Sequence, residues 1–254
     1  MDRLAYTSLT GLSETAYPQR QLNNEIANLN TPGFKRSYSI VAKTLKVEGA
    51  GLDTRFEPSN THVDRVALTP GPVTYTGNAL DVALSGSTVL GVTAADGSLA
   101  FTRRGDLRVN AAGQLETGAG QLVRGVNGPL QAPPGYTLEI TGDGSVYATP
   151  PNNPQGAAPV LVGRMLLRDA STTPLKRRSD TLLEPETARN PSGDIADGRQ
   201  APALTPGALE GSNVSAFESL VRLMELTRAY EANIRFIKEA KTIDEAGASM
   251  MKSS

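Results

Sequence analysis

Few residues of this chain have the type and spacing that catalysis requires. His62 is the single histidine, and it lies in the polar stretch PSNTHVDRV with Asp64 two residues away. A histidine beside a carboxylate can act as a general base that takes a proton from a nucleophile or a substrate. No nucleophile pattern accompanies this pair. We therefore expect His62 to be a surface residue.

Phosphate and metal sites have equally little support. TGAGQLVRG (117–125) is rich in glycine, but it lacks the lysine and the spacing of a P-loop, so it predicts a turn. Asp194 and Asp197 offer too few oxygens, at the wrong spacing, for an EF-hand. Cysteine is absent, which excludes disulfides, thiolate ligands and cysteine nucleophiles. We expect no enzyme activity, no cofactor and no metal.

The overall charge also narrows the class of partner. With 254 residues and a net charge of −1, the chain has no excess of either sign, which argues against nucleic acid and against insertion into or binding to an anionic membrane. Lys176, Arg177 and Arg178 form a local basic cluster, predicted to be solvated and able to face acidic patches of a neighbour. The 25 glycines and 17 prolines favour short strands over a large helical bundle.

The first thirty residues have the pattern of a helix that stops abruptly. Apolar residues recur at helical spacing at Leu9, Leu12 and Ala16, and again at Leu22, Ile26 and Leu29. Pro18 should kink or split this helix. Asn28 is a candidate C-cap, and Pro32 forces Thr31 out of the helical region. Pro32-Gly33 then suits the centre of a type II turn, which leaves Phe34 extended.

The middle of the chain, about 34–190, is typical of antiparallel β structure. Short apolar runs are separated by Asp96-Gly97, Gly105-Asp106, Ala112-Gly113 and Gly142-Asp143-Gly144, which predict successive hairpins. No helix–strand alternation is visible, so a parallel sheet is disfavoured. The Pro- and Gly-rich stretch 184–207 then predicts a linker or exposed loop.

A long amphipathic helix is predicted at the C-terminal end. Ser215 and Glu218 fit a capping box that starts it. A broad apolar stripe follows, made of Phe217, Leu220, Val221, Met224, Tyr230, Ile234 and Ile237. Thirty or more residues of helix reach about 50 Å, which is too long to lie within a small β domain.

Two amphipathic helices at opposite ends of the chain can bury their stripes against each other and against further copies. The predicted assembly interface consists of Leu9, Leu12, Leu22, Ile26, Asn28, Leu29 and the seven residues of the C-terminal stripe, and Thr31, Pro32, Gly33 and Phe34 form its turn. The pattern favours a self-assembling rod or tube. The alternative from spacing alone is that both helices pack on the body of a monomer.

Three motifs resemble those of the flagellar axial proteins, which are the rod, hook and hook-associated subunits. NNEIANLNTPGFKR (23–36) resembles the N-terminal signature of that family, RAYEANIRFIK (228–238) is similar to its C-terminal helix, and LDVALSG with DGSLAFTRRGDLRVNAAGQL (80–115) looks like its central block. Phe101 replaces a tyrosine of that block. The length, LTPGPVTYTGNALDVAL (68–84) and ALEGSNVSA (208–216) look most like a proximal rod subunit, with a distal rod subunit as the alternative.

The resemblance implies a fold and a function. The expected class is α+β, with long N- and C-terminal helices paired as a coiled-coil domain and a central, mostly antiparallel β domain. The expected division is an N-terminal helix (1–33), a linker region (34–76), a β domain (77–183), a return segment (184–213) and a C-terminal helix (214–254). Family membership further implies a torque-transmitting rod that spans the periplasm. Its partners would be other rod subunits, copies of itself and the flagellar type III export apparatus, which exports subunits without a cleaved signal peptide. A soluble β-domain binding module is the remote alternative.

Overall fold

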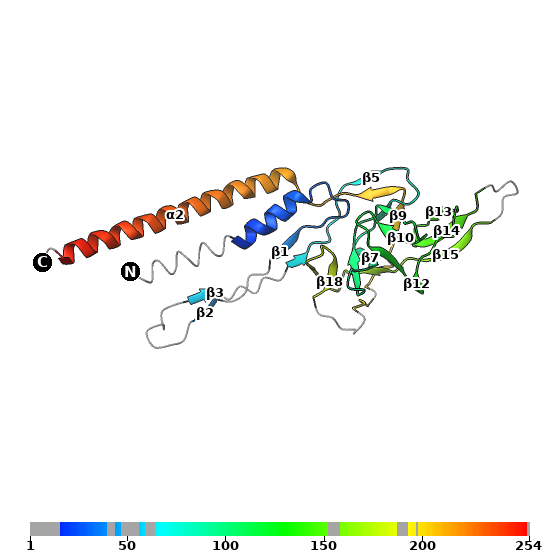
Figure 1. Cartoon of the computed structure of the whole chain (residues 1–254), viewed down its shortest axis with the longest axis horizontal. Helices are drawn as coiled ribbons and strands as arrows, with labels where there is room; N and C mark the ends of the chain where they lie inside the picture. Colours follow the sequence, from blue (N-terminus) through cyan, green and yellow to red (C-terminus); the bar gives the residue numbers. More distant parts are fainter. Residues whose placement is uncertain are drawn as a thin grey trace. The chain divides into compact units, whose positions relative to one another are not determined.

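The computed structural model describes residues 16–39, 44–46, 56–58, 64–151, 158–186, 193–196 and 198–252. The chain divides into two compact units, which we call the helical unit (Met1–Ala27, Ile40–His62 and Ser215–Ser254) and the β unit (Asn28–Ser39 and Val63–Val214). Figure 1 shows both units coloured along the sequence.

Short strands make up most of the β unit. In chain order they are β1 Ser37–Ser39, β4 Asp64–Val66, β5 Val73–Tyr75, β6 Val82–Leu84, β7 Thr88–Thr93, β8 Leu99–Thr102, β9 Leu107–Val109, β10 Leu115–Thr117, β11 Leu122–Gly125, β12 Gly128–Pro129, β13 Thr137–Ile140, β14 Ser145–Thr149, β15 Val160–Arg164, β16 Leu167–Asp169, β17 Leu175–Arg177, β18 Leu183–Pro185, β19 Leu204–Pro206 and β20 Ala208–Glu210.

The strands pair in antiparallel fashion, as the sequence predicts. The principal sheet has the order β1-β4-β17-β18-β8-β7-β11-β10-β9, with β12 and β16 attached to β11 and β7. A separate sheet holds β13, β14 and β15, and two ribbons pair β19 with β6 and β20 with β5. The predicted turns at Asp96-Gly97, Ala112-Gly113 and Gly142-Asp143-Gly144 do join paired strands.

Gly105-Asp106 is different, because β8 and β9 are not paired with each other. A Cβ on Gly105 would lie 1.8 Å from the carbonyl oxygen of Val82, whose amide donates to the carbonyl of Gly105 at 2.9 Å. Glycine is therefore required at this position by the close approach of two backbones, not by a hairpin turn.

Strand β7 separates two apolar cores. Successive side chains of a strand point to opposite faces, and accordingly Leu90 and Val92 belong to one cluster while Val89 packs in the other with Phe101. Residues 88–92 of β7 are all buried. A strand buried on both faces has the near-continuous apolar sequence TVLGV instead of an alternating pattern.

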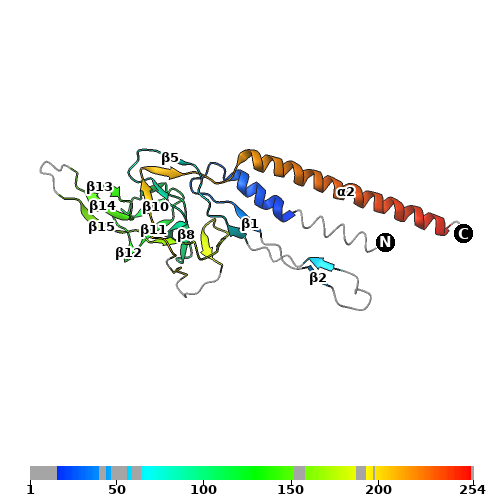
Figure 2. The same ribbon diagram turned by 180° about the vertical axis from the view of Figure 1, so that it is seen from behind.

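In the helical unit, α2 spans Ala216–Lys252, residues 16–27 are helical, and β2 Thr44–Lys46 pairs with β3 Phe56–Pro58. The predicted N-cap of α2 is present, because the amide of Glu218 donates to the hydroxyl of Ser215 at 3.4 Å. Both views show the 16–27 helix beside the N-terminal part of α2 (Figures 1 and 2). Leu22 is buried there, as is Glu25.

The predicted coiled-coil domain of two long paired helices is wrong. Within the described residues only α2 is long, at 37 residues, and the N-terminal helical stretch covers only 16–27. A coiled coil needs one continuous apolar seam with a repeat of about 3.5 residues. The apolar residues of α2 instead spread over more than one face, and Phe217, Leu220 and Met224 are exposed. The fold is mostly antiparallel β with a single long helix. Leu9 and Leu12 lie outside the described residues.

Candidate functional site

The turn after the N-terminal helix is built as predicted. The helix ends at Ala27, and the hydroxyl of Thr31 donates to the side-chain carbonyl of Asn28 at 3.1 Å. The amide of Phe34 donates to the carbonyl of Thr31 at 3.2 Å, and Gly33 has a φ of +67°, which together define a type II turn. A Cβ on Gly33 would lie 2.1 Å from the carbonyl oxygen of Arg103. Glycine is thus required both for the turn and for packing.

Three charged residues from distant parts of the chain meet beside this turn. Lys35 Nζ lies 2.7 Å from Glu210 Oε1, and Arg103 Nη2 lies 2.7 Å from Glu210 Oε2. Their relative exposures are 2%, 1% and 2% for Lys35, Arg103 and Glu210, so the ion cluster is buried. Each residue belongs to a different sequence motif. Arg103 and Glu210 are 107 residues apart in the sequence, and Lys35 and Glu210 are 175 apart.

Backbone carbonyls accept the remaining hydrogen bonds of Arg103 and a second hydrogen bond of Lys35. Arg103 donates to the carbonyls of Leu84 at 2.6 Å, Gly86 at 2.6 Å and Thr88 at 3.0 Å, which fixes the loop between β6 and β7. Lys35 donates to the carbonyl of Thr69 at 3.0 Å. Burial lowers the pKa of Lys35 below its ordinary value, against the opposing effect of Glu210. The role of these contacts is structural. Each buried cation is bonded to a carboxylate and to backbone carbonyls, and it thereby fixes the backbone segments that carry those carbonyls.

Asn213 completes the connection between the two ends of the β unit. Its side-chain oxygen accepts from the amide of Arg36 at 2.7 Å, and its side-chain nitrogen donates to the carbonyls of Ala67 at 3.0 Å and Thr69 at 3.2 Å. The amide of Asn213 donates to the carbonyl of Phe34 at 3.2 Å. The three sequence motifs therefore converge at one place, where the chain enters and leaves the β unit. We call Lys35, Arg103, Glu210 and Asn213 the motif cluster.

Sequence reasoning missed the functional members of this cluster. Arg103, Glu210 and Asn213 lie in quoted motifs, yet the sequence pattern assigns none of them a role, and residues 184–207 are predicted to be a linker or exposed loop. At 204–206 that prediction is wrong, because β19 pairs with β6 and Leu204 is buried. The strand that follows, β20, buries Ala208 and Glu210. The available signal was alternation: Ala208 and Glu210 occupy the same face of a short strand, and a glutamate there requires a cationic partner.

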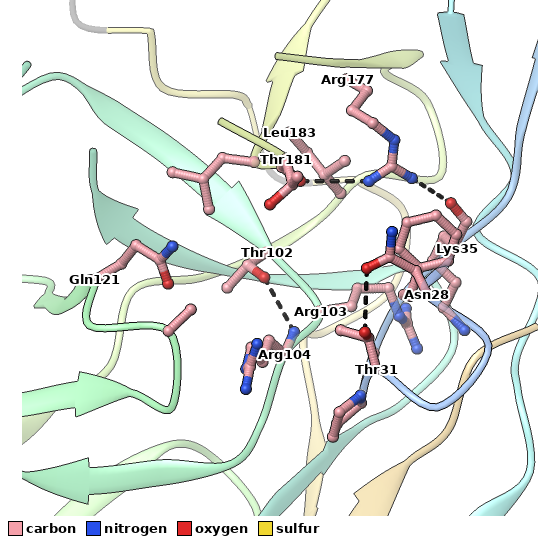
Figure 3. A pocket seen from close by; sticks show the side chains of 15 residues that line it. Asn28, Thr31, Lys35, Thr102, Arg103, Arg104, Gln121, Arg177, Thr181 and Leu183 are labelled. Atoms are coloured by element: carbon pink, nitrogen blue, oxygen red, sulfur yellow. Dashed lines mark hydrogen bonds between the residues drawn. The ribbon is translucent and has the colours of Figure 1, made fainter. Parts of the chain in front are cut away.

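A small pocket lies beside the motif cluster, with a volume of about 60 Å³ (Figure 3). Arg177 lies over the ring of Phe34, 4.4 Å from its centroid, and donates to the carbonyls of Lys35 and Thr181. The central residue of the predicted solvated basic cluster is thus part of the packing around the turn. Arg104 pairs with Asp106 at 2.6 Å at another side of the pocket. The fifteen residues that line the pocket include no nucleophile with an adjacent base.

The second candidate surface is the apolar part of α2. At about 100° per residue, Phe217, Leu220, Val221 and Met224 share one face. All four are exposed, Phe217 to 78%. Leu223, Leu226, Ile234 and Ile237 lie on the opposite side and are half-buried. A helix with apolar residues on opposite sides can pack against more than one neighbour.

The remaining residues singled out in the sequence lie at separate places in the structure. Ile26 and Leu29 are half-buried, and Tyr230 is exposed. Asp194 pairs with Arg168 at 2.9 Å. Lys176 pairs with Glu184 at 3.0 Å and Arg178 with Asp96 at 2.9 Å, so both are solvent-facing ion pairs. His62 and Asp197 lie outside the described residues.

Neither a metal-binding group nor a membrane-spanning helix is present among the described residues. No group of three or more His, Cys, Asp or Glu side chains in that part of the chain is arranged to hold a metal ion. Among the same residues, no helix has an apolar segment of the length that crossing a membrane requires.

Comparison with known proteins gives the motif cluster and α2 a family context. Residues 205–250 match the family model described as "Flagellar basal body rod FlgEFG protein C-terminal", and residues 83–148 match "Flagellar hook protein FlgE/F/G D1 domain". The flagellar basal-body rod protein FlgF of Escherichia coli K12 is 34% identical over 97% of this chain and 96% of its own length. FlgF of Salmonella typhimurium is 33% identical, covering 93% of each chain. The rod protein FlgG of Buchnera aphidicola (subsp. Baizongia pistaciae) is 30% identical over 91% of this chain and 93% of its own.

Proposed function

This chain belongs to the flagellar basal-body rod protein family, and we propose on that ground that it is a structural subunit of the flagellar rod, placed in the proximal rod. The observation that carries this is 34% identity to a FlgF protein over 97% of the chain. The distal rod is the second candidate place, because a FlgG protein is 30% identical over 91% of the chain. A structural role requires no catalytic residues.

We propose that the subunit assembles through the predicted interface residues other than Leu22, which is buried within the chain, and above all through the exposed apolar face Phe217, Leu220, Val221 and Met224. A contiguous apolar surface in water costs about 25 cal/mol for each Å² left exposed, so its burial against neighbouring subunits favours association. The half-buried side of α2 supports the same proposal, because it leaves the exposed face available for a second neighbour.

The motif cluster fits the proposed torque-transmitting role. Residues 33–36 and 210–213 are tied to each other by buried ion pairs and backbone hydrogen bonds. Load carried by one of these segments passes to the other without passing through a flexible loop.

We further propose export through the flagellar type III apparatus without cleavage and assembly in the periplasm. Mass spectrometry of rod-incorporated protein would test this, since a shortened N-terminus would contradict it.

The assembly proposal is tested by placing a charge on the exposed face. Met224→Glu should reduce incorporation into isolated basal bodies and abolish motility when it is the sole copy, because the charge would have to be buried without a partner. Ala229→Glu is the matched control: it adds the same charge at an exposed position on another side of α2. Leu22→Glu is unsuitable, because Leu22 is buried within the chain itself. Normal motility of the Met224→Glu strain would contradict the proposal.

A further inference from the structure

The motif cluster carries an unbalanced charge. Two cations, Lys35 and Arg103, share the single carboxylate of Glu210, and all three residues are almost completely buried. Backbone carbonyls accept further hydrogen bonds of both cations, but carbonyl dipoles only partly offset a full charge in a medium of low dielectric constant. Within the described residues no second carboxylate bonds to either cation. The cluster therefore has a residual positive charge that an additional anion would neutralise.

The pocket beside the cluster has the composition expected of an anion site. Lys35 and Arg103 line it together with Arg104, and its fifteen lining residues include no Asp or Glu. Figure 3 shows Arg104 and Gln121 on one side of the pocket and Asn28 and Thr31 on the other. Arg177 lines it as well. Glu210 bonds Lys35 and Arg103, and Asp106 bonds Arg104. These two carboxylates offset four cations only in part, so the electrostatic potential in the pocket is positive.

Two side chains of the lining have spare donors. Arg104 uses Nε and Nη2 on Asp106, which leaves Nη1. Gln121 accepts from the hydroxyl of Thr117 through its side-chain oxygen, and its side-chain nitrogen has no acceptor among the described residues. Spare N–H donors beside a net positive charge are complementary to an anionic hydrogen-bond acceptor, such as a carboxylate. The volume of about 60 Å³ accommodates a carboxylate group with a few waters.

We propose that this pocket receives a carboxylate side chain of a neighbouring subunit, a second copy of this chain, in the assembled rod. The proposal rests on the proposed function, because only assembly supplies that neighbour. A single monovalent anion from solution binds such an open pocket weakly. A carboxylate fixed on a docked neighbour has a far higher effective concentration and pays no further loss of translational freedom.

Gln121→Glu is the direct test, because it places a carboxylate in the pocket within the chain itself. The substitution is isosteric and keeps the acceptor for Thr117. It should raise the midpoint of thermal unfolding of the full chain by about 2–4 °C, the shift given by about 1 kcal/mol of stabilisation in a chain of this size. It should also lower incorporation into basal bodies at least tenfold, since the neighbour's carboxylate is then repelled. The control Gln131→Glu adds the same charge at an exposed position and should do neither.

Acetate serves as a probe of the pocket's chemistry. At equal ionic strength and pH, sodium acetate should raise the thermal midpoint of the wild-type chain relative to sodium chloride, and Gln121→Glu should remove this gain. If Gln121→Glu is not stabilised and acetate has no effect, the anion site is overturned. If Gln121→Glu and acetate both raise the thermal midpoint but Gln121→Glu is incorporated normally, the proposal that a second copy of the chain occupies the pocket is overturned. Failure of the proposed function can be told apart from failure of the anion site, because the wild-type protein itself would then be missing from basal bodies.

Discussion

At the scale of single residues, Glu210 is the side chain on which the β unit depends most. It bonds Lys35, Arg103 and the amide of Gly71, so its loss leaves two cations buried without any carboxylate. Removing one partner of a buried ion pair costs about 3–5 kcal/mol. We predict that Glu210→Gln lowers the free energy of unfolding of the full chain by that amount, measured by urea denaturation followed by circular dichroism.

Glu186→Gln provides the control for this measurement. Glu186 pairs with Arg65 at 2.6 Å, but both side chains are partly exposed, and such pairs contribute at most about 1 kcal/mol. Equal losses for Glu210→Gln and Glu186→Gln would show that the motif cluster contributes no more than a surface ion pair.

Lys35 gives the cluster a pH dependence with a definite sign. Burial lowers the pKa of Lys35 in the folded chain below its ordinary value of 10.5. Between the folded pKa and 10.5 the unfolded chain binds one proton more than the folded chain, so the free energy of unfolding rises with pH across that window. Below the folded pKa, this contribution is a constant penalty. We predict that the rise is present in the wild type and absent in Lys35→Met, measured by urea unfolding at intervals above about pH 8. Parallel curves for the two proteins would contradict it.

At the scale of elements, local signals predicted most of the structure. The type II turn at 31–34, the N-cap at Ser215, the antiparallel pairing and three of the four hairpin turns each depend on a few adjacent residues, and each is present. The prediction of two long paired helices is wrong because it rests on periodicity alone, and an apolar stripe does not specify its partner. On α2 the apolar residues divide between a half-buried side and an exposed face, which a single stripe does not describe.

The ion cluster was unpredictable for a different reason. Its members are far apart in sequence, and a lysine, an arginine and a glutamate in polar motifs ordinarily indicate solvated residues. Only the strand pairing of β20 with β5 and the close approach of Gly33 to Arg103 place the three charges together. Gly105 shows the same limit of prediction from local sequence. Its neighbours indicate a turn, but glycine is required there because the backbone of Val82, 23 residues earlier in the sequence, approaches so closely.

At the scale of the whole molecule, the β unit is closed by its last strands. β19 pairs with β6 and β20 pairs with β5, and β20 also supplies Glu210 to the ion cluster. A chain that lacks residues 204–214 therefore loses two strand pairings and the only carboxylate that bonds Lys35 and Arg103 within the described residues. Breaking a buried ion pair alone costs about 3–5 kcal/mol, a large part of the about 5–15 kcal/mol by which a domain is stable.

We predict that a fragment spanning residues 28–214 unfolds in one cooperative transition, whereas a fragment spanning 28–203 does not. Circular dichroism and urea denaturation of the two fragments would measure this directly. Glu210→Gln in the 28–214 fragment separates the charge from the strands: a weakened but cooperative transition would assign the remaining stability to the pairing of β19 and β20. If 28–203 unfolds as cooperatively as 28–214, the core around β7 is sufficient by itself, and the motif cluster fastens a domain that is already folded.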